Sequence, residues 1–226
     1  MTTRLTDATR LGIRTIAELA VTGGLVLVAF VFYLLVWTGH QTAAAQSDLM
    51  DEFEKQAAHA QSDGKATPHT SPKAGDGLGV LHIPALGKDW AWVVVEGVQD
   101  DDLAKGPGHF PGTAMPGEIG NFAVAGHRST HGEPFAYLDK LQVGDSVVME
   151  TVDSWYVYKV TWERILSPTA TEVTDPVAGH PGQQATQRTM TLVTCNPRWG
   201  SSERMVFGAQ LVEKRDASAG PPAVLG

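Results

Sequence analysis

Three side chains at the ends of apolar segments have the chemistry of a cysteine acyltransferase. Cys195, the only cysteine of the chain, ends the segment TLVTC. His127 ends the segment FAVAGH, and Arg204 follows the cysteine after an eight-residue loop. A thiolate attacks a carbonyl carbon, an imidazolium lowers the pKa of the thiol and protonates a leaving amine, and a guanidinium stabilises the oxyanion. These residue types predict nucleophilic catalysis by Cys195, the alternative being a buried and inert thiol.

Short β-strands must position these residues. Apolar residues alternate with a period of two through the second half of the chain, and turns rich in Gly and Pro interrupt the pattern. The expected strands are 78–83, 90–95, 121–126, 146–151, 155–162, 189–195 and 203–212. Seven or eight strands with a helix near 134–141 indicate a mainly β fold, a closed or nearly closed barrel. If the last two strands pair through their loop, Cys195 and Arg204 lie at the same end of the barrel.

An apolar segment of 19 residues without charge, 19–37, precedes the strands. As a helix it is about 28 Å long, close to the thickness of the hydrocarbon core of a bilayer. The flanking charges are Arg4, Arg10 and Arg14 before it, and Asp48, Asp51, Glu52 and Glu54 after it. Positive charge favours the cytoplasmic side, so we expect a single-pass signal anchor in the cell membrane with an extracellular catalytic domain. A cleavable signal peptide with its cleavage site at 43–45 is the alternative.

Composition then divides the chain into five parts. They are a cytoplasmic tail at 1–18, the anchor at 19–37, an extracellular linker at 38–77, the catalytic barrel at 78–215 and a flexible tail at 216–226. Within the linker, 48–61 has the pattern of a short amphipathic helix, and 62–77 is rich in Pro, Gly and Ser and has no apolar core.

Composition also excludes several classes of function. A net charge of −8 argues against a protein that binds nucleic acid. A single cysteine rules out an intramolecular disulfide and a cysteine-rich zinc site. His109, His131 and His180 lie in separate Gly- and Pro-rich loops without the spacing of metal ligands. We therefore expect no metal and no other cofactor.

The TLVTC motif, the histidine of AGHR and an arginine shortly after the cysteine resemble the sortases, the membrane-anchored cysteine transpeptidases of Gram-positive bacteria. The resemblance covers 78–212, and segments such as IPALGKDWAWVVVEG are most similar to class E. It implies a single eight-stranded barrel with no metal requirement, in which Cys195 is the nucleophile, His127 the acid and base, and Arg204 the oxyanion ligand. One position departs from the family, because His131 stands where an aromatic residue, commonly tyrosine, is expected.

The resemblance also implies a reaction and its partners. Cys195 would cleave the Thr–Gly bond of an LAxTG- or LPxTG-type sorting motif in a secreted protein, form a thioester, and pass the acyl group to an amine of a peptidoglycan precursor or cross-bridge. Thr194, Arg128 and His131 are weaker candidates for contacts with the oxyanion or the substrate. The alternatives are a sortase that polymerises pilins, a cysteine protease whose thioester is hydrolysed, and a non-catalytic barrel that binds the cell wall.

Overall fold

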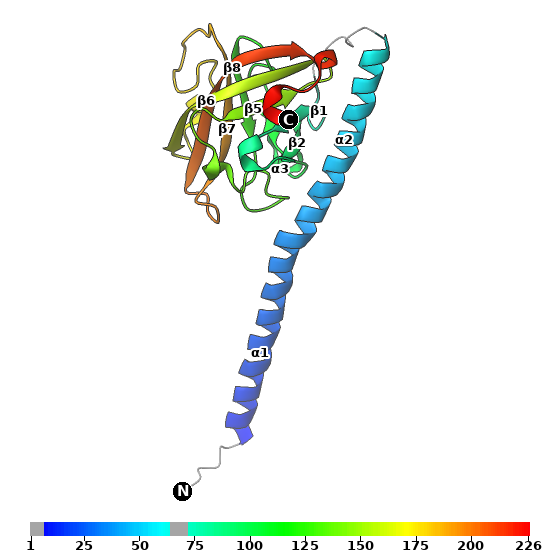
Figure 1. Cartoon of the computed structure of the whole chain (residues 1–226). Helices are drawn as coiled ribbons and strands as arrows, with labels where there is room; N and C mark the ends of the chain where they lie inside the picture. The colour runs from blue at the N-terminus through cyan, green and yellow to red at the C-terminus, as the bar shows by residue number, and fades with distance from the viewer. Residues whose placement is uncertain (1–6, 64–71) are drawn as a thin grey trace.

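The computed structural model describes residues 7–63 and 72–226, and it begins with one long helical rod. Helix α1 (Asp7–Phe32) continues through a π-helical turn (Tyr33–Trp37) into α2 (Thr38–Asp63). The rod extends far beyond the rest of the molecule (Figure 1). Its segment Thr9–Phe32 is long and apolar enough to cross a membrane, and none of it is buried against protein. This segment overlaps the anchor expected at 19–37. Of the three arginines that precede the anchor in the sequence, Arg4 lies outside the described residues.

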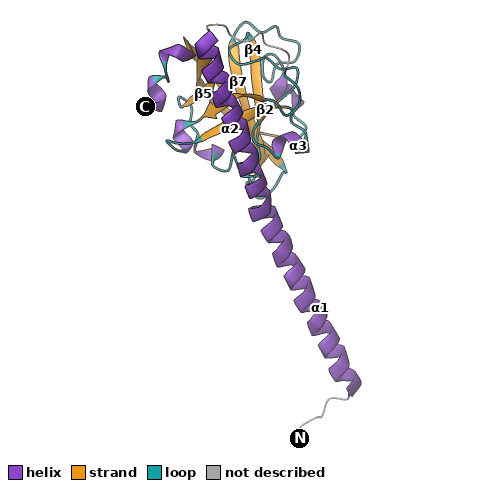
Figure 2. Cartoon of the chain, turned by 90° about the vertical axis from the view of Figure 1, so that its right-hand side faces the viewer, coloured by secondary structure: helices purple, strands orange, loops and turns teal. Residues whose placement is uncertain are grey.

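Helix α2 corrects the expectation of a linker over 38–77. It is one continuous helix rather than a short one at 48–61, and it lies along the side of the barrel (Figure 2). The apolar side chains of Leu49, Met50 and Phe53 share one face of the helix and pack against the barrel. A helix with such a face buries it where it can, so this part of the chain belongs to the folded domain. Much of the Pro- and Gly-rich stretch, 64–71, lies outside the described residues.

Polar contacts fasten α2 to the barrel as well. The amide of Gln46 donates to the carbonyls of Val93 and Lys105 at 3.0 and 2.8 Å and accepts the backbone N–H of Val93 at 2.8 Å. The hydroxyl of Thr42 donates to the carbonyl of Ala104 at 2.7 Å. These bonds satisfy backbone groups that a bare barrel edge would leave exposed to water or unpaired. The rod and the barrel are therefore joined along a shared, specific contact.

Eight strands form a closed barrel, as the sequence predicts. The strands are β1 (Gly77–His82), β2 (Ala91–Glu96), β3 (Gly108–His109), β4 (Gly120–Ala125), β5 (Ser146–Glu150), β6 (Ser154–Leu166), β7 (Arg188–Asn196) and β8 (Glu203–Asp216). Their order around the barrel is β1-β2-β3-β4-β7-β8-β6-β5, and β5 pairs with β1 to close it. The pairs β2–β3 and β4–β7 are parallel and the others antiparallel.

Short helices complete the domain, again in agreement with the sequence. One α-helical turn, α3 (Asp100–Leu103), follows β2, and 3-10 turns include Pro84–Leu86, Leu138–Lys140 and Thr171–Thr174. The turn at Leu138–Lys140 falls inside the helix expected at 134–141.

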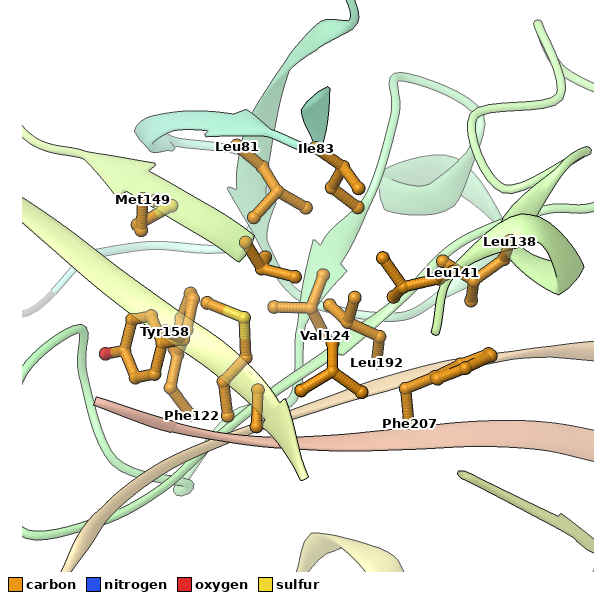
Figure 3. Close-up of a cluster of buried hydrophobic side chains, with 14 of the residues drawn as sticks. Leu81, Ile83, Phe122, Val124, Leu138, Leu141, Met149, Tyr158, Leu192 and Phe207 are labelled. Carbon is orange, nitrogen blue, oxygen red and sulfur yellow. The ribbon is translucent and has the colours of Figure 1, made fainter. Parts of the chain in front are cut away.

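Apolar side chains from opposite sides of the barrel meet in its interior (Figure 3). The labelled members of this core are Leu81, Ile83, Phe122, Val124, Leu138, Leu141, Met149, Tyr158, Leu192 and Phe207. Alternation along each strand sends the other side chains outward, and two of these, Val193 and Val206, form a second buried cluster on the outside of β7 and β8 with Val173 of the turn Thr171–Thr174. Both faces of these two strands are thus packed close to where Cys195 lies.

The C-terminal residues differ from the flexible tail expected at 216–226. Two 3-10 turns, Ala217–Ala219 and Ala223–Leu225, fold the segment back onto the barrel. Leu225 packs against a buried cluster that includes Trp155, and the guanidinium of Arg215 donates to the carbonyl of Pro221 at 2.9 Å. The apolar end of the segment, AVLG, gains burial by this return, which its short length did not suggest.

Candidate active site

Strand pairing brings Cys195, Arg204 and His127 to one end of the barrel. In the antiparallel β7–β8 pair, Cys195 stands directly opposite Arg204. In the parallel β4–β7 pair, Ala125 stands opposite Val193, and His127 and Cys195 each follow two residues later. The carboxyl ends of parallel strands lie at the same end of a sheet. His127, just after β4, and Cys195, near the end of β7, are therefore at the same height along the barrel.

Cys195 is a free, half-buried thiol on the outer face of β7. Successive side chains of a strand point to opposite faces, so Cys195 shares its face with Val193, whereas Thr194 shares the inner face with Leu192. The buried hydroxyl of Thr194 donates its proton to the carbonyl of Gly126 at 2.7 Å. In this structure the one hydroxyl proton of Thr194 is therefore used, and its side chain lies on the other face from the thiol; its role as an oxyanion donor stays a prediction.

His127 lies half-buried at the start of the loop after β4 and stacks on a second imidazole. Its ring and that of His131 are 4.7 Å apart between centroids, with 25° between their planes. Burial, and then repulsion from the charged form of His131, lower the pKa of His127, and Asp100 opposes this shift. Burial likewise lowers the pKa of His131 against the attraction of Asp100. The two rings therefore disfavour simultaneous protonation.

The loop that carries His131 is held in an unusual backbone conformation. His131, Gly132 and Glu133 all have positive φ, at 52°, 72° and 52°. Such angles are uncommon for residues other than glycine and cost energy. Contact with α2 supports the loop, because the N–H of His131 faces the hydroxyl of Thr38 at 3.4 Å, and a Cβ at Gly132 would lie 3.2 Å from the methyl group of Thr42.

Arg128 is buried and bonded within the protein, which differs from the expected contact with substrate or oxyanion. Its guanidinium donates to Asn196 Oδ1 at 2.6 Å and to the carbonyl of Cys195 at 3.4 Å, and it pairs with Asp139 at 3.2 Å. With these acceptors around it, the guanidinium holds the backbone at Cys195 in place. The sequence did contain a signal for this role, since a charged residue flanked by apolar segments must find internal partners when it is buried.

Arg204 is half-buried, and its side chain is turned to the loop after Cys195. Its Nη1 donates to the carbonyls of Ser201 and Glu203 at 3.0 and 2.9 Å. Within residues 7–63 and 72–226, neither its Nε nor its Nη2 has a hydrogen bond, so these donors remain free for a ligand. The carboxylate of Glu203 accepts instead from Asn196 Nδ2 at 2.7 Å.

A groove of about 390 Å³ runs along the same outer face of β7 as Cys195. The β6–β7 connection covers it through residues such as His180, and its floor includes Thr189 and Thr191. Thr191 is four residues from Cys195, about 13 Å along a strand. An extended peptide of four residues has the same length, so the groove and the thiol can be reached by one short segment.

Potential metal ligands do not cluster in the part of the chain that the structure describes, where no group of three His, Cys, Asp or Glu side chains could hold an ion. His109 is buried and bonded to Glu96 at 2.6 Å and to Thr113 at 2.8 Å. These two hydrogen bonds satisfy both ring nitrogens of His109.

Comparison with known proteins identifies the family to which this fold belongs. The model of the sortase domain family matches residues 81–212. Sortase E1 of Streptomyces coelicolor is 38% identical over 94% of this chain, and the chain spans only 60% of the length of that relative. Sortase E2 of the same organism is 33% identical, over 93% of this chain and 87% of the relative.

Solved structures show the same likeness. Sortase E of Streptomyces avermitilis superposes with a TM-score of 0.63 at 40% identity, covering 68% of this chain and 99% of that one. Sortase E1 of S. coelicolor with a tripeptide in its active site superposes with a TM-score of 0.62 at 41% identity, covering 67% and 98%. With its closed barrel and its matching family domain, the chain belongs to the sortase family of cysteine transpeptidases, and within that family it is a class E sortase.

Proposed function

We propose that this chain is a membrane-anchored sortase that cuts a Thr–Gly bond in a sorting motif and joins the threonine to an amine. The thiolate of Cys195 attacks the threonine carbonyl carbon, a C–S bond forms, and the C–N bond to glycine breaks. An acceptor amine then attacks the thioester, and the C–S bond breaks to return the thiolate. The observation that carries this proposal is the register that sets Cys195 opposite Arg204 and level with His127.

His127 moves the protons in both halves of the reaction. As imidazolium it donates a proton to the departing glycine amine, and as neutral imidazole it takes one from the incoming amine. Because both protonation states are used, the rate should pass through a maximum with pH, and its limits belong to the Cys195–His127 pair together. The lowered pKa of His127 favours the neutral state that the second half requires.

Arg204 supplies charge to the tetrahedral intermediate. Its free Nε and Nη2 donors can face the oxyanion while Nη1 stays bonded to the loop carbonyls. A fixed guanidinium changes its position little during the reaction, and this preorganisation is the source of its effect.

The groove beside β7 is the proposed site for the residues that precede the scissile bond. From Thr191 in its floor to Cys195 is about 13 Å along β7, the length of the extended leucine-to-threonine part of an LAxTG or LPxTG motif, and the class E relative from S. coelicolor holds a tripeptide in its active site. The partners are then secreted proteins with such a C-terminal motif and an amine of a peptidoglycan precursor or cross-bridge.

The N-terminal rod is the proposed membrane anchor. Arg10 and Arg14 lie at its start and acidic residues follow its apolar part, so the catalytic barrel should face the outside of the cell. Tyr33 and Trp37 stand at the outer end of this part, where aromatic residues favour the membrane interface.

Mass spectrometry of the full chain in nanodiscs tests this function. The protein is mixed with LAxTG and LPxTG peptides and with two amines, a peptidoglycan stem-peptide amine and a lysine-containing pilin peptide. We expect a mass shift on Cys195, a product cut between Thr and Gly, and transfer to the stem-peptide amine. Product from Cys195→Ala would refute the thioester, transfer to lysine alone would indicate pilin polymerisation, and free threonine acid alone would indicate a protease. Cys195→Ala, with only the sulfur removed, is also the control for folding.

A further inference from the structure

We propose that the end of the barrel carrying Cys195 rests on the outer surface of the bilayer through a patch formed by Tyr137, Lys140, Arg198 and Trp199, here called the interfacial patch. The ligand is the lipid headgroup region itself. This inference rests on the proposed anchor, and it adds an orientation and a contact surface that the reaction alone does not require.

The first support is the height above the membrane at which the candidate active site contacts the helical rod. The apolar part of the rod continues past Phe32 through the turn Tyr33–Trp37, and Thr38, the residue facing the N–H of His131, follows it directly. Each headgroup region of a bilayer is on the order of 5–8 Å thick. A rod that spans the membrane near its normal therefore places the loop of His127 and His131 within the headgroup region.

Because α2 is attached to the barrel along several turns, the height of Thr38 above the membrane also fixes the height of the barrel. Thr42, Gln46 and Phe53 fasten α2 to the strands over three turns of helix, and Thr38 and Thr42 are buried. The contact starts directly after Trp37, so little helix is left free between the membrane and the domain. Figure 1 shows the loop between β7 and β8 at the lower end of the barrel, the end from which α1 extends.

The second support is the composition of the patch. Trp199 is 68% exposed and Tyr137 49% exposed, which is unusual for large aromatic side chains. Arg198 lies over both rings, at 4.8 Å from that of Tyr137 and 5.3 Å from that of Trp199, and Lys140 lies 4.4 Å over Tyr137. The four side chains thus form one connected surface on two loops of the same barrel end.

Aromatic rings backed by cations suit a lipid headgroup region. Tryptophan and tyrosine have an apolar body and a polar tip, and they gather at membrane interfaces. A lysine near the surface gains free energy from anionic lipids, and Lys140 can do so here, whereas the guanidinium of Arg198 is paired with Glu133 at 2.6 Å. Ile119, which is 56% exposed just before β4, marks the opposite end of the barrel and carries no such cations among the described contacts. The patch therefore distinguishes the two ends.

Spin labels on the full chain in nanodiscs test the orientation. In the Cys195→Ala background, which leaves no other cysteine, a label is placed by Val26→Cys, Trp199→Cys or Ile119→Cys in separate variants. The discs contain phosphatidylcholine with phosphatidylglycerol, and collisions with oxygen and with a water-soluble nickel chelate report depth. We expect the label at 26 deep in the bilayer, the label at 199 at headgroup depth, and the label at 119 in water.

Charge reversal supplies a second measurement. Arg198→Glu with Lys140→Glu should shift the label at 199 toward water, whereas Lys73→Glu with Lys214→Glu, the matched control at the other end, should leave it unchanged. A label at 199 as accessible to the chelate as that at 119, with 26 still deep, overturns the interfacial patch and leaves the anchor standing. If the label at 26 is itself in water, the anchor fails and the inference falls with it. None of these readings depends on transpeptidase activity.

Discussion

The imidazole rings of His127 and His131 stack with their centroids 4.7 Å apart, and each lies within reach of the field of Asp100. Two rings at this distance act as one titrating unit, because a proton on one disfavours a proton on the other. The sequence marked His131 as a departure from an aromatic residue and as a weaker candidate for contact with the oxyanion or the substrate. The stack shows that this position contacts the proposed acid and base directly.

Replacing His131 should raise the pKa of His127. His131→Tyr keeps a ring and removes the positive charge, and His131→Asn removes the ring and tolerates positive φ at this position. In both variants the repulsion is gone, so the imidazolium of His127 persists to higher pH. NMR titration of the ring in the Cys195→Ala background measures the change, and the low-pH limit of the rate profile should move upward with it. His180→Asn, an exposed histidine outside this loop, is the control. An unchanged or lowered pKa in both variants would contradict the electrostatic account.

Loss of Arg204 should slow the reaction without unfolding the protein. Arg204→Ala removes the donors proposed for the oxyanion, for which a decrease in kcat of about 10²–10³-fold is typical. Arg204→Lys should recover little of this, since an ammonium cannot hold the two loop carbonyls and reach the oxyanion at once. Peptide cleavage kinetics on the full chain measure it. Arg215→Ala, near the opposite end of β8, should stay active; wild-type rates in Arg204→Ala would remove the residue from the mechanism.

Arg128 should matter for stability as well as for rate. Arg128→Met leaves Asn196 Oδ1 without its donor and releases the backbone at Cys195. We expect a loss of about 1–3 kcal/mol in the free energy of unfolding, as for other buried hydrogen-bonding groups. Asp139→Asn should cost less, because Asp139 is half exposed and its ion pair is screened by water. Urea titration of the full chain in detergent compares the two, and equal losses would show that the ion pair with Asp139, rather than the bond to Asn196, holds Arg128.

The contact between α2 and the barrel should depend on Gln46. Gln46→Ala leaves the N–H of Val93 and two carbonyls without partners, at an expected cost of about 1–3 kcal/mol. Hydrogen exchange at the amide of Val93 should become faster. Gln56→Ala provides the matched control, since Gln56 is exposed on the same helix and bonds only to Glu52. Equal exchange at Val93 in both variants would mean that Gln46 does not hold the helix in place.

Local pattern was enough to predict the strands other than β3 and to propose the catalytic residues. Alternation with a period of two predicts β6 and β8, because successive side chains of a strand point to opposite faces whichever other elements pack against them. Cys195, His127 and Arg204 were found because each ends or begins an apolar segment, and barrel strands share their ends. The same alternation places Thr194 on the other face from Cys195, although the two residues are adjacent along the chain.

Other features depended on contacts between distant segments. Residues 38–63 by themselves read as a polar tether, and only the barrel edge at Val93 shows what Gln46 and Phe53 pack against. The three acceptors of Arg128 and the stacking of His131 on His127 join residues from separate loops. Sequence alone determined the periodicity, the apolar N-terminal segment and the reactive residue types, since these are properties of neighbouring residues. Tertiary structure decided the partners, because burial and charge interactions depend on which segments meet in space.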